Sequence, residues 1–298
     1  MKFSTKQKAI VALCVVALSF ALLNVSVRFA NTGFGSFTQV YLRIGLGLLL
    51  TLIFFYKKIS FKKMIKTSKR DLVILFLMGT LGYGIAVDFI TLGVLHTSLF
   101  NAAVIGSTTP FFLFLFNFFI LRKKFHISLF FFLIISFYGV CVLATNFLLP
   151  KFANFSLGDL YVLLFAIGSC FFILGRKFLS DYLNNSEIAV SVMLVAFISS
   201  VIVALAAGQQ LSVSGFANPL ALLGICLGGV LNLIATKLQN FGFPHLNAVV
   251  GSQLLLLQNI FAPIFGFILF QETILPIEFI GAMLVLGGVW LYILKEAD

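Results

Sequence analysis

The stretch Asn101–Arg122, NAAVIGSTTPFFLFLFNFFILR, has a counterpart 149 positions later within Asn247–Gln271, NAVVGSQLLLLQNIFAPIFGFILFQ. The two stretches align without a gap. The same offset relates further pairs of residues: His96 and His245, Gly93 and Gly242, Gly139 and Gly288, Phe29 and Phe178, and Arg28 and Lys177. One offset that holds from end to end indicates an internal duplication. We therefore expect two domains, residues 1–149 and residues 150–298.

The composition is that of a membrane protein. Hydrophobic residues make up 61% of the chain and charged residues 10%, whereas soluble domains carry roughly 45–50% and about 25%. The net charge of +11 arises from lysines and arginines in short segments between apolar runs. Membrane topology accounts for that distribution, so we expect no nucleic-acid partner.

Ten apolar segments are long enough to cross a bilayer, since a spanning helix needs about 20 residues. They run near residues 8–28, 37–56, 71–95, 98–121, 127–147, 157–178, 187–207, 219–241, 246–270 and 276–294. If successive connections lie on alternate sides of the membrane, 16 lysines and arginines lie on the same side as the N-terminus. Only Arg28 and Lys151 lie on the other side. The positive-inside rule then predicts a multi-pass protein of the cytoplasmic membrane with both termini cytoplasmic.

Five helices per half is an odd number, so the second copy must cross the membrane upside down relative to the first. The predicted fold is an all-α membrane protein with ten transmembrane helices in two inverted five-helix repeats. In secondary transporters of this plan the substrate path lies between the halves.

The segment Lys57–Arg70 is too polar to span the membrane. We expect it to lie on the anionic inner leaflet as a lipid contact, because each cation contributes about 1 kcal/mol there. A site for a cytosolic partner is the alternative. A homodimer is a further alternative, since the sequence leaves the oligomeric state open.

Three charged residues fall inside predicted helices, where a charge costs roughly 2.5–3.5 kcal/mol at the bilayer centre. They are Arg43, Asp88 and Lys237. Their positions predict Arg43 and Asp88 as near neighbours in the outer half of the membrane, and Lys237 alone near the cytosolic mouth. The alternatives are snorkelling of Arg43 and Lys237 to the interface and a buried structural pair that includes Asp88.

Polar residues at helical spacing mark one face of the fourth helix and one face of the ninth. They include Gly106, Thr109 and Asn117 in the fourth and Gln258 and Asn259 in the ninth. These faces either line a central cavity or pack tightly without a ligand. Pro110 frees the carbonyl of Gly106, which a ligand could use. Further lining candidates are Asn24, Gln239 and Asn240.

The sequence has no motif for a soluble catalytic centre. It lacks H-E-x-x-H and a P-loop, and only one aspartate, Asp88, lies deep within a predicted span. The cysteines lie singly in apolar runs, as buried hydrophobes do. We therefore expect no enzymatic activity, no cofactor and no metal.

Several marks resemble the EamA-type family of the drug/metabolite transporter superfamily, over nearly the whole chain. They are Arg28 and Lys177 at helix ends, Arg43, the Asn101–Pro110 stretch, Gln271-Glu272 where the family usually has Gly-Glu, Gly281-Ala282-Met283-Leu284 and Gly287-Gly288-Val289. Two departures are Lys123, where glutamate is usual, and Asn259, where proline is usual.

The resemblance implies transport of small metabolites, often amino acids, through a central cavity, with the fifth and tenth helices outside. We expect a secondary transporter that moves an amino-acid-like or similar polar or amphipathic solute by alternating access. The alternatives are a channel, facilitator or lipid scramblase and, less favoured, an intramembrane enzyme.

Overall fold

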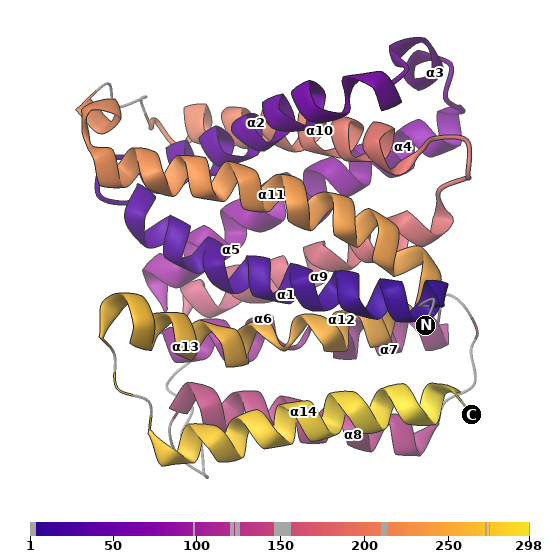
Figure 1. Ribbon diagram of the computed structural model, residues 1–298, viewed down its shortest axis with the longest axis vertical. Helices are drawn as coiled ribbons and strands as arrows, with labels where there is room; N and C mark the ends of the chain where they lie inside the picture. Colours follow the sequence, from indigo (N-terminus) through magenta and orange to yellow (C-terminus); the bar gives the residue numbers. More distant parts are fainter. Residues whose placement is uncertain are drawn as a thin grey trace.

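The computed structural model describes residues 4–97, 99–119, 122, 126–145, 156–209, 214–271, 273 and 275–297, and every regular element in these ranges is helical (Figure 1). The first half of the chain forms α1 (Thr5–Ala30), α2 (Ser36–Phe55), η1 (Tyr56–Lys58), α3 (Phe61–Ile65), α4 (Lys69–Gly79), η2 (Thr80–Gly84), α5 (Ile85–His96), α6 (Leu99–Gly106), α7 (Thr109–Phe119) and α8 (Ile127–Thr145). The second half forms α9 (Leu157–Phe178), α10 (Asn185–Ala206), η3 (Ser214–Ala217), α11 (Pro219–His245), α12 (Ala248–Leu255), α13 (Gln258–Phe270) and α14 (Pro276–Ala297). Lys123, Lys151 and Glu272 lie outside the described residues.

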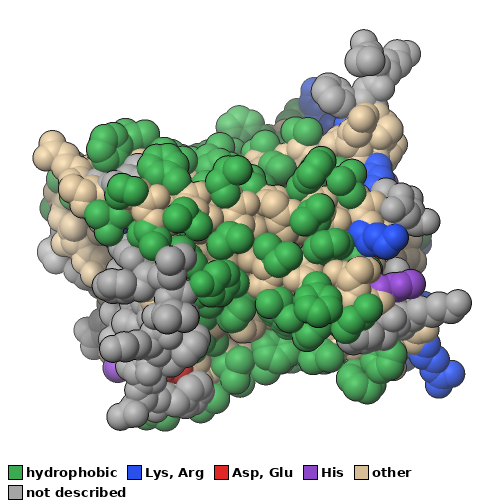
Figure 2. All heavy atoms as spheres, turned by 90° about the horizontal axis from the view of Figure 1, so that it is seen from below, with side chains coloured by type: hydrophobic (Ala, Val, Ile, Leu, Met, Phe, Trp, Pro, Cys, Tyr) green, Lys and Arg blue, Asp and Glu red, His purple; other side chains and the backbone are tan. Residues whose placement is uncertain are grey.

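Ten stretches are long and apolar enough to cross a membrane, which confirms the predicted spans. The third span is α4–η2–α5, the fourth is α6–α7 and the ninth is α12–α13. Figure 2 shows a broad apolar face, with the lysines and arginines visible in that view gathered at one end. We call this the basic end; the segment Lys57–Arg70 and the start of α1 lie there.

Helix starts follow local chemistry. Asn247 and Asn218 cap α12 and α11, as expected at these positions, and Pro219 occupies the first turn of α11. Proline suits that position because its missing N–H would be unpaired there anyway. These caps fix where each span enters the bundle.

Contacts between the halves obey an inverted two-fold symmetry. Gly93 is so close to α9 that a Cβ built on it would lie 2.4 Å from Val162 Cγ2. Its equivalent Gly242 approaches Leu13, the equivalent of Val162, with the corresponding distance 2.7 Å. A contact between residues i and j thus recurs between i + 149 and j − 149. Small residues permit such close helix approach, and their exchange across the halves confirms the inverted repeats.

The same rule holds at the edge of the bundle. Figure 1 shows α8 and α14 side by side there, in line with the expectation that the fifth and tenth helices lie outside. Gly139 packs on Val285, and Gly288 packs on Ser136, the equivalent of Val285. This pair contacts the rest of the bundle mainly through α6, α12 and α13.

Three spans are irregular. The fourth is interrupted at residues 107–108 and the ninth at residues 256–257, and these breaks are equivalent under the 149-residue offset. Pro110 accounts for the first break, because it cannot donate to Gly106. The third span contains the π-helical turn η2, a feature often found at functional sites. These three irregular stretches therefore lie within the spans, away from the two ends of the bundle.

Candidate functional site

A single hydrogen bond marks the symmetry axis of the molecule. The Tyr83 hydroxyl, on η2, donates to Asn232 Oδ1, on α11, over 2.8 Å, and these residues are 149 positions apart. Two equivalent residues of an inverted repeat can contact each other only near the axis that relates the halves. Thr236, one turn further along α11, also lies within reach of the Tyr83 hydroxyl. The interface between the two halves, which we call the seam, therefore contains a part-buried polar contact.

The breaks in the fourth and ninth spans also meet across this seam. Asn259 Nδ2, at the start of α13, donates to Ser107 Oγ at the break of the fourth span over 3.3 Å. Thr109 lies beside Ser169 of α9, with 3.3 Å between the two hydroxyl oxygens. Broken helices that meet at a repeat interface are where transporters of this plan hold their substrates.

The carbonyl freed by Pro110 was predicted to be available to a ligand, but it already accepts one hydrogen bond within the chain. The Thr109 hydroxyl donates to Gly106 O over 3.1 Å. A threonine directly before the proline satisfies the orphaned acceptor, as hydroxyl side chains commonly do in membrane helices. A Cβ built on Gly106 would lie 3.7 Å from Val162, so this glycine packs on α9.

Arg43 crosses from α2 to the seam. Its side chain is 5% exposed; Nε donates to Gln39 O over 3.2 Å and Nη1 to Ser26 Oγ over 3.4 Å. The stem runs over Gly228 of α11, where a Cβ would lie 2.3 Å from Arg43 Cδ. Tyr83 lies near the guanidinium. No described carboxylate lies within ion-pair distance of Arg43.

Asp88 is 2% exposed, and neither carboxylate oxygen has a hydrogen-bond partner among the described residues. Ser200 of α10 lies beside it, and the Ser200 hydroxyl is likewise without a partner in the described part of the chain. A buried carboxylate without a partner is strongly unfavourable in its charged form. Among the described residues, Ser200 is thus the polar side chain beside this carboxyl group.

The predicted proximity of Arg43 and Asp88 is wrong. Arg43 reaches α1 and α11, whereas Asp88 faces α10. The prediction rested on depth along straight α-helices, but the π-helical turn η2 lies immediately before α5. One extra residue in a turn rotates everything downstream by about 100°. Tyr83 contacts α11 across the seam, whereas Asp88 lies beside Ser200 of α10.

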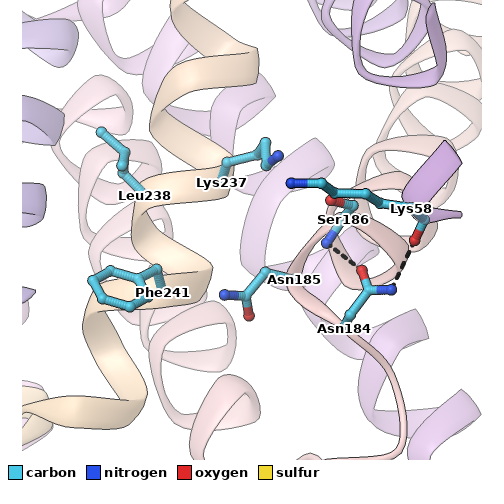
Figure 3. A pocket seen from close by; sticks show the side chains of 7 residues that line it. All are labelled: Lys58, Asn184, Asn185, Ser186, Lys237, Leu238 and Phe241. Carbon is cyan, nitrogen blue, oxygen red and sulfur yellow. Dashed lines mark hydrogen bonds between the residues drawn. The ribbon is translucent and has the colours of Figure 1, made fainter. Parts of the chain in front are cut away.

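Lys237 is not alone, contrary to the prediction. It lines a pocket of about 580 Å³ at the basic end, together with Lys58, Asn184, Asn185, Ser186, Leu238 and Phe241 (Figure 3). Its ammonium group lies over the Phe55 ring, a favourable contact for a cation. Lys58 belongs to the segment Lys57–Arg70, which follows the second span. It lies near Lys237 because the second span packs against α11.

The remaining candidates are spread along the bundle. Asn117 Nδ2 donates to Asn247 Oδ1 over 3.0 Å, which joins α7 to the cap of α12. Gln239 and Asn240 are buried in α11, and the Asn240 side-chain amide has no partner among the described residues. Gln258 is half-buried at the start of α13, and Asn24 is exposed on α1.

Several polar residues of the seam escaped the sequence analysis. They are Ser26, Tyr83, Ser107, Ser169, Ser200, Asn232 and Gln253. Gln253 on α12 is fully buried, and neither amide atom has a partner in the described ranges. The offset could have revealed one pair, since Tyr83 and Asn232 are equivalent polar residues in the middle of two spans. For the others, no periodicity distinguishes a seam residue from a packing residue.

Comparison with known proteins gives a consistent result. The sequence profile of the EamA-like transporter family matches residues 7–145 and residues 156–294. No curated protein matches the sequence. A crystal structure, titled only as that of a protein, superimposes with a TM-score of 0.78 at 13% identity and with 100% of both chains covered. At that identity the likeness concerns the fold alone.

Proposed function

Because this membrane protein belongs to the EamA-like transporter family, within the drug/metabolite transporter superfamily, we propose that it is a secondary transporter that moves a small polar or amphipathic metabolite by alternating access. The observation that carries the proposal is the polar seam on the internal two-fold axis, where the Tyr83 hydroxyl donates a hydrogen bond to Asn232. In an inverted repeat, each half can adopt the conformation of the other, which exchanges the open side.

The buried Arg43 supports this substrate class. Arg43 offers a guanidinium whose hydrogen-bond partners are one carbonyl and one hydroxyl. Guanidinium groups bind carboxylates bidentately and with high specificity. The carboxylate partner of Arg43 would be that of an amino-acid-like solute, and the amides of Asn259 and Gln253 add neutral donors and acceptors. Asp88, which lies beside Ser200 of α10, is the candidate for carrying a proton.

Proton coupling through Asp88 is the second part of the proposal. α5 packs against α2, η2, α6, α9 and α10, and the charged or titratable residues on those elements include Arg43, Tyr83 and Tyr161, which stacks on Phe89. None of these pairs with the Asp88 carboxyl within the described residues. Exchange driven by the solute gradient alone is the alternative.

The experiment uses the full-length protein in proteoliposomes. Amino acids and related metabolites that raise the thermal stability of the purified protein, as ligands do by mass action, are then tested as radiolabelled solutes. We expect saturable uptake that unlabelled solute inside the vesicles accelerates. Flux that does not saturate and shows no such acceleration would favour a channel or scramblase and refute alternating access.

We further propose that the basic end faces the cytoplasm, in the cytoplasmic membrane, with both termini inside. The segment Lys57–Arg70 would then lie on the anionic leaflet. In support, Phe61 and Ile65 of α3 are 61% and 81% exposed beside the lysines, as in segments that lie at an interface. Labelling of single cysteines introduced at each end of the bundle in intact cells tests the orientation.

A further inference from the structure

The pocket at the basic end is bounded by three elements: η1, the start of α10 and the last third of α11. Figure 3 shows the side chains of Lys58 and Lys237 pointing toward one another across it. The two ammonium groups are close enough to repel each other. Leu238 and Phe241 of α11 form its apolar wall. Two like charges held face to face are unfavourable, unless an anion lies between them.

None of the seven lining residues is acidic. Glu187, the carboxylate that directly follows the lining residue Ser186, is already engaged: its oxygens accept from Ser60 N and Asn184 N, over 3.1 and 2.8 Å. It also pairs with Lys63 over 3.5 Å. Neither Lys58 nor Lys237 forms an ion pair with a described carboxylate. The pocket therefore carries uncompensated positive charge.

The neutral groups of the pocket also favour an anion. Asn185 Oδ1 accepts a hydrogen bond from Arg176 Nη2 over 3.0 Å, which orients the amide and leaves its NH2 group as a donor. The pocket also includes the Ser186 hydroxyl and the first turn of the 22-residue helix α10. Helix N-termini attract negative charge through their dipole, and here the N–H groups of Ser186 and Glu187 already donate to Asn184 Oδ1. Two ammonium groups and an oriented amide thus line one space.

We propose that this pocket is an oxyanion-binding site that takes a phosphate or carboxylate group between Lys58 and Lys237. The group comes either from the headgroup of an anionic lipid, whose acyl chain would follow Leu238 and Phe241, or from a soluble anion. The site differs from the polar seam in its lining, because it is formed with η1 and the start of α10, whereas the polar contact of the seam joins α11 to η2. The inference does not rest on the proposed transport activity.

The test measures binding to the purified full-length protein in a neutral detergent. Thermal unfolding is followed against inorganic phosphate and against dihexanoyl phosphatidic acid, with sodium chloride at matched ionic strength and dihexanoyl phosphatidylcholine as reference additives. We expect a saturable rise of Tm with at least one of the two anions. Stabilisation by the lipid alone assigns the headgroup as the source, and stabilisation by inorganic phosphate assigns a soluble anion.

Lys58→Gln and Lys237→Gln should each weaken the apparent affinity by about tenfold or more, the usual effect of losing a charge-assisted hydrogen bond. Lys62→Gln is the matched control, since Lys62 is exposed on α3 outside the pocket and the charge change is identical. Lys237→Arg should keep the binding if Lys237→Gln fails to fold. The proposal is overturned if neither anion exceeds its reference additive, or if Lys62→Gln loses as much affinity as Lys58→Gln. Uptake that persists in the lysine variants would leave the transport proposal intact in either case.

Discussion

Asp88 and Lys237 occupy equivalent positions in the two repeats, yet their surroundings differ. Asp88 is sealed between α5 and α10, whereas Lys237 borders an open pocket at the opposite end of the bundle. The backbone around them obeys the same symmetry, as the contacts of Gly93 and Gly242 illustrate. Duplication thus preserved the packing, while the polar residues diverged and gave each end of the molecule its own chemistry.

A second pair of equivalent regions sharpens this point. Gly79 of α4 packs on α10, with a built Cβ 2.9 Å from Val192 O. The equivalent contact in the other half joins Gly228 to Arg43, the equivalent of Val192. At the position equivalent to the buried Arg43, the other half therefore holds a buried apolar residue, Val192. The duplicated scaffold carries either residue type at this position, which makes Arg43 a candidate for function.

The largest effect is expected from Arg43→Val, which gives the first repeat the residue of the second. The fold should persist, because valine already fills the equivalent position. Uptake of the identified solute in proteoliposomes should fall by roughly tenfold to a hundredfold, the effect of losing hydrogen bonds to a charged group. Val192→Ile serves as the control at the equivalent site. Wild-type uptake by Arg43→Val would show that the arginine is structural.

Alanine at Gly79 and at Gly228 should separate packing from function. At Gly79 the new Cβ meets Val195 Cβ at 2.6 Å and the Val192 carbonyl, so the free energy of unfolding should fall by about 1–3 kcal/mol. At Gly228 it meets the flexible Arg43 side chain, so uptake should fall more than stability does. Gly287→Ala, with nothing within 4 Å of the new Cβ, should change neither. Equal losses of stability at Gly79 and Gly228, with uptake preserved, would contradict this separation.

Asp88→Asn should change how uptake responds to pH rather than abolish it. Asparagine resembles a permanently protonated carboxyl group, so a pH gradient should no longer drive accumulation, while exchange between the two sides continues. Counterflow and gradient-driven uptake measured on the same vesicles check this. Ser200→Ala is the control, since it removes the neighbouring hydroxyl and keeps the carboxyl group. Equal gradient dependence in wild type and Asp88→Asn would exclude Asp88 as the proton carrier.

The sequence predicted the spans and their inverted symmetry because both depend on averages over many residues. Hydropathy over some 20 residues and a constant offset tolerate local exceptions. The site depended on single residues and turns: beyond the π-helical turn, Asp88 lies beside Ser200 rather than beside Arg43, and the Thr109 hydroxyl donates to the carbonyl that Pro110 frees. The pocket of Lys58 and Lys237 joins residues of different halves. No pattern within either segment predicts such a meeting.

The smallest expected effect concerns the ends of the two broken spans. Gln271 ends α13 with φ 57°, and its equivalent Arg122 has φ 50°. Both lie in the left-handed region, where glycine is favoured at helix ends and other residues lose about 1 kcal/mol. The family resemblance places glycine at position 271, and the backbone angle supplies the physical reason for it. Gln271→Gly should therefore raise the free energy of unfolding by about 1 kcal/mol in chemical denaturation, with uptake unchanged. The reverse change tests the same cause. Gly208 has φ 69° and nothing within 4 Å of a Cβ built on it, so Gly208→Ala should lower the free energy of unfolding by a similar amount. If Gln271→Gly destabilises the protein instead, then the Gln271 side chain contributes more at this end of the bundle than its backbone angle costs.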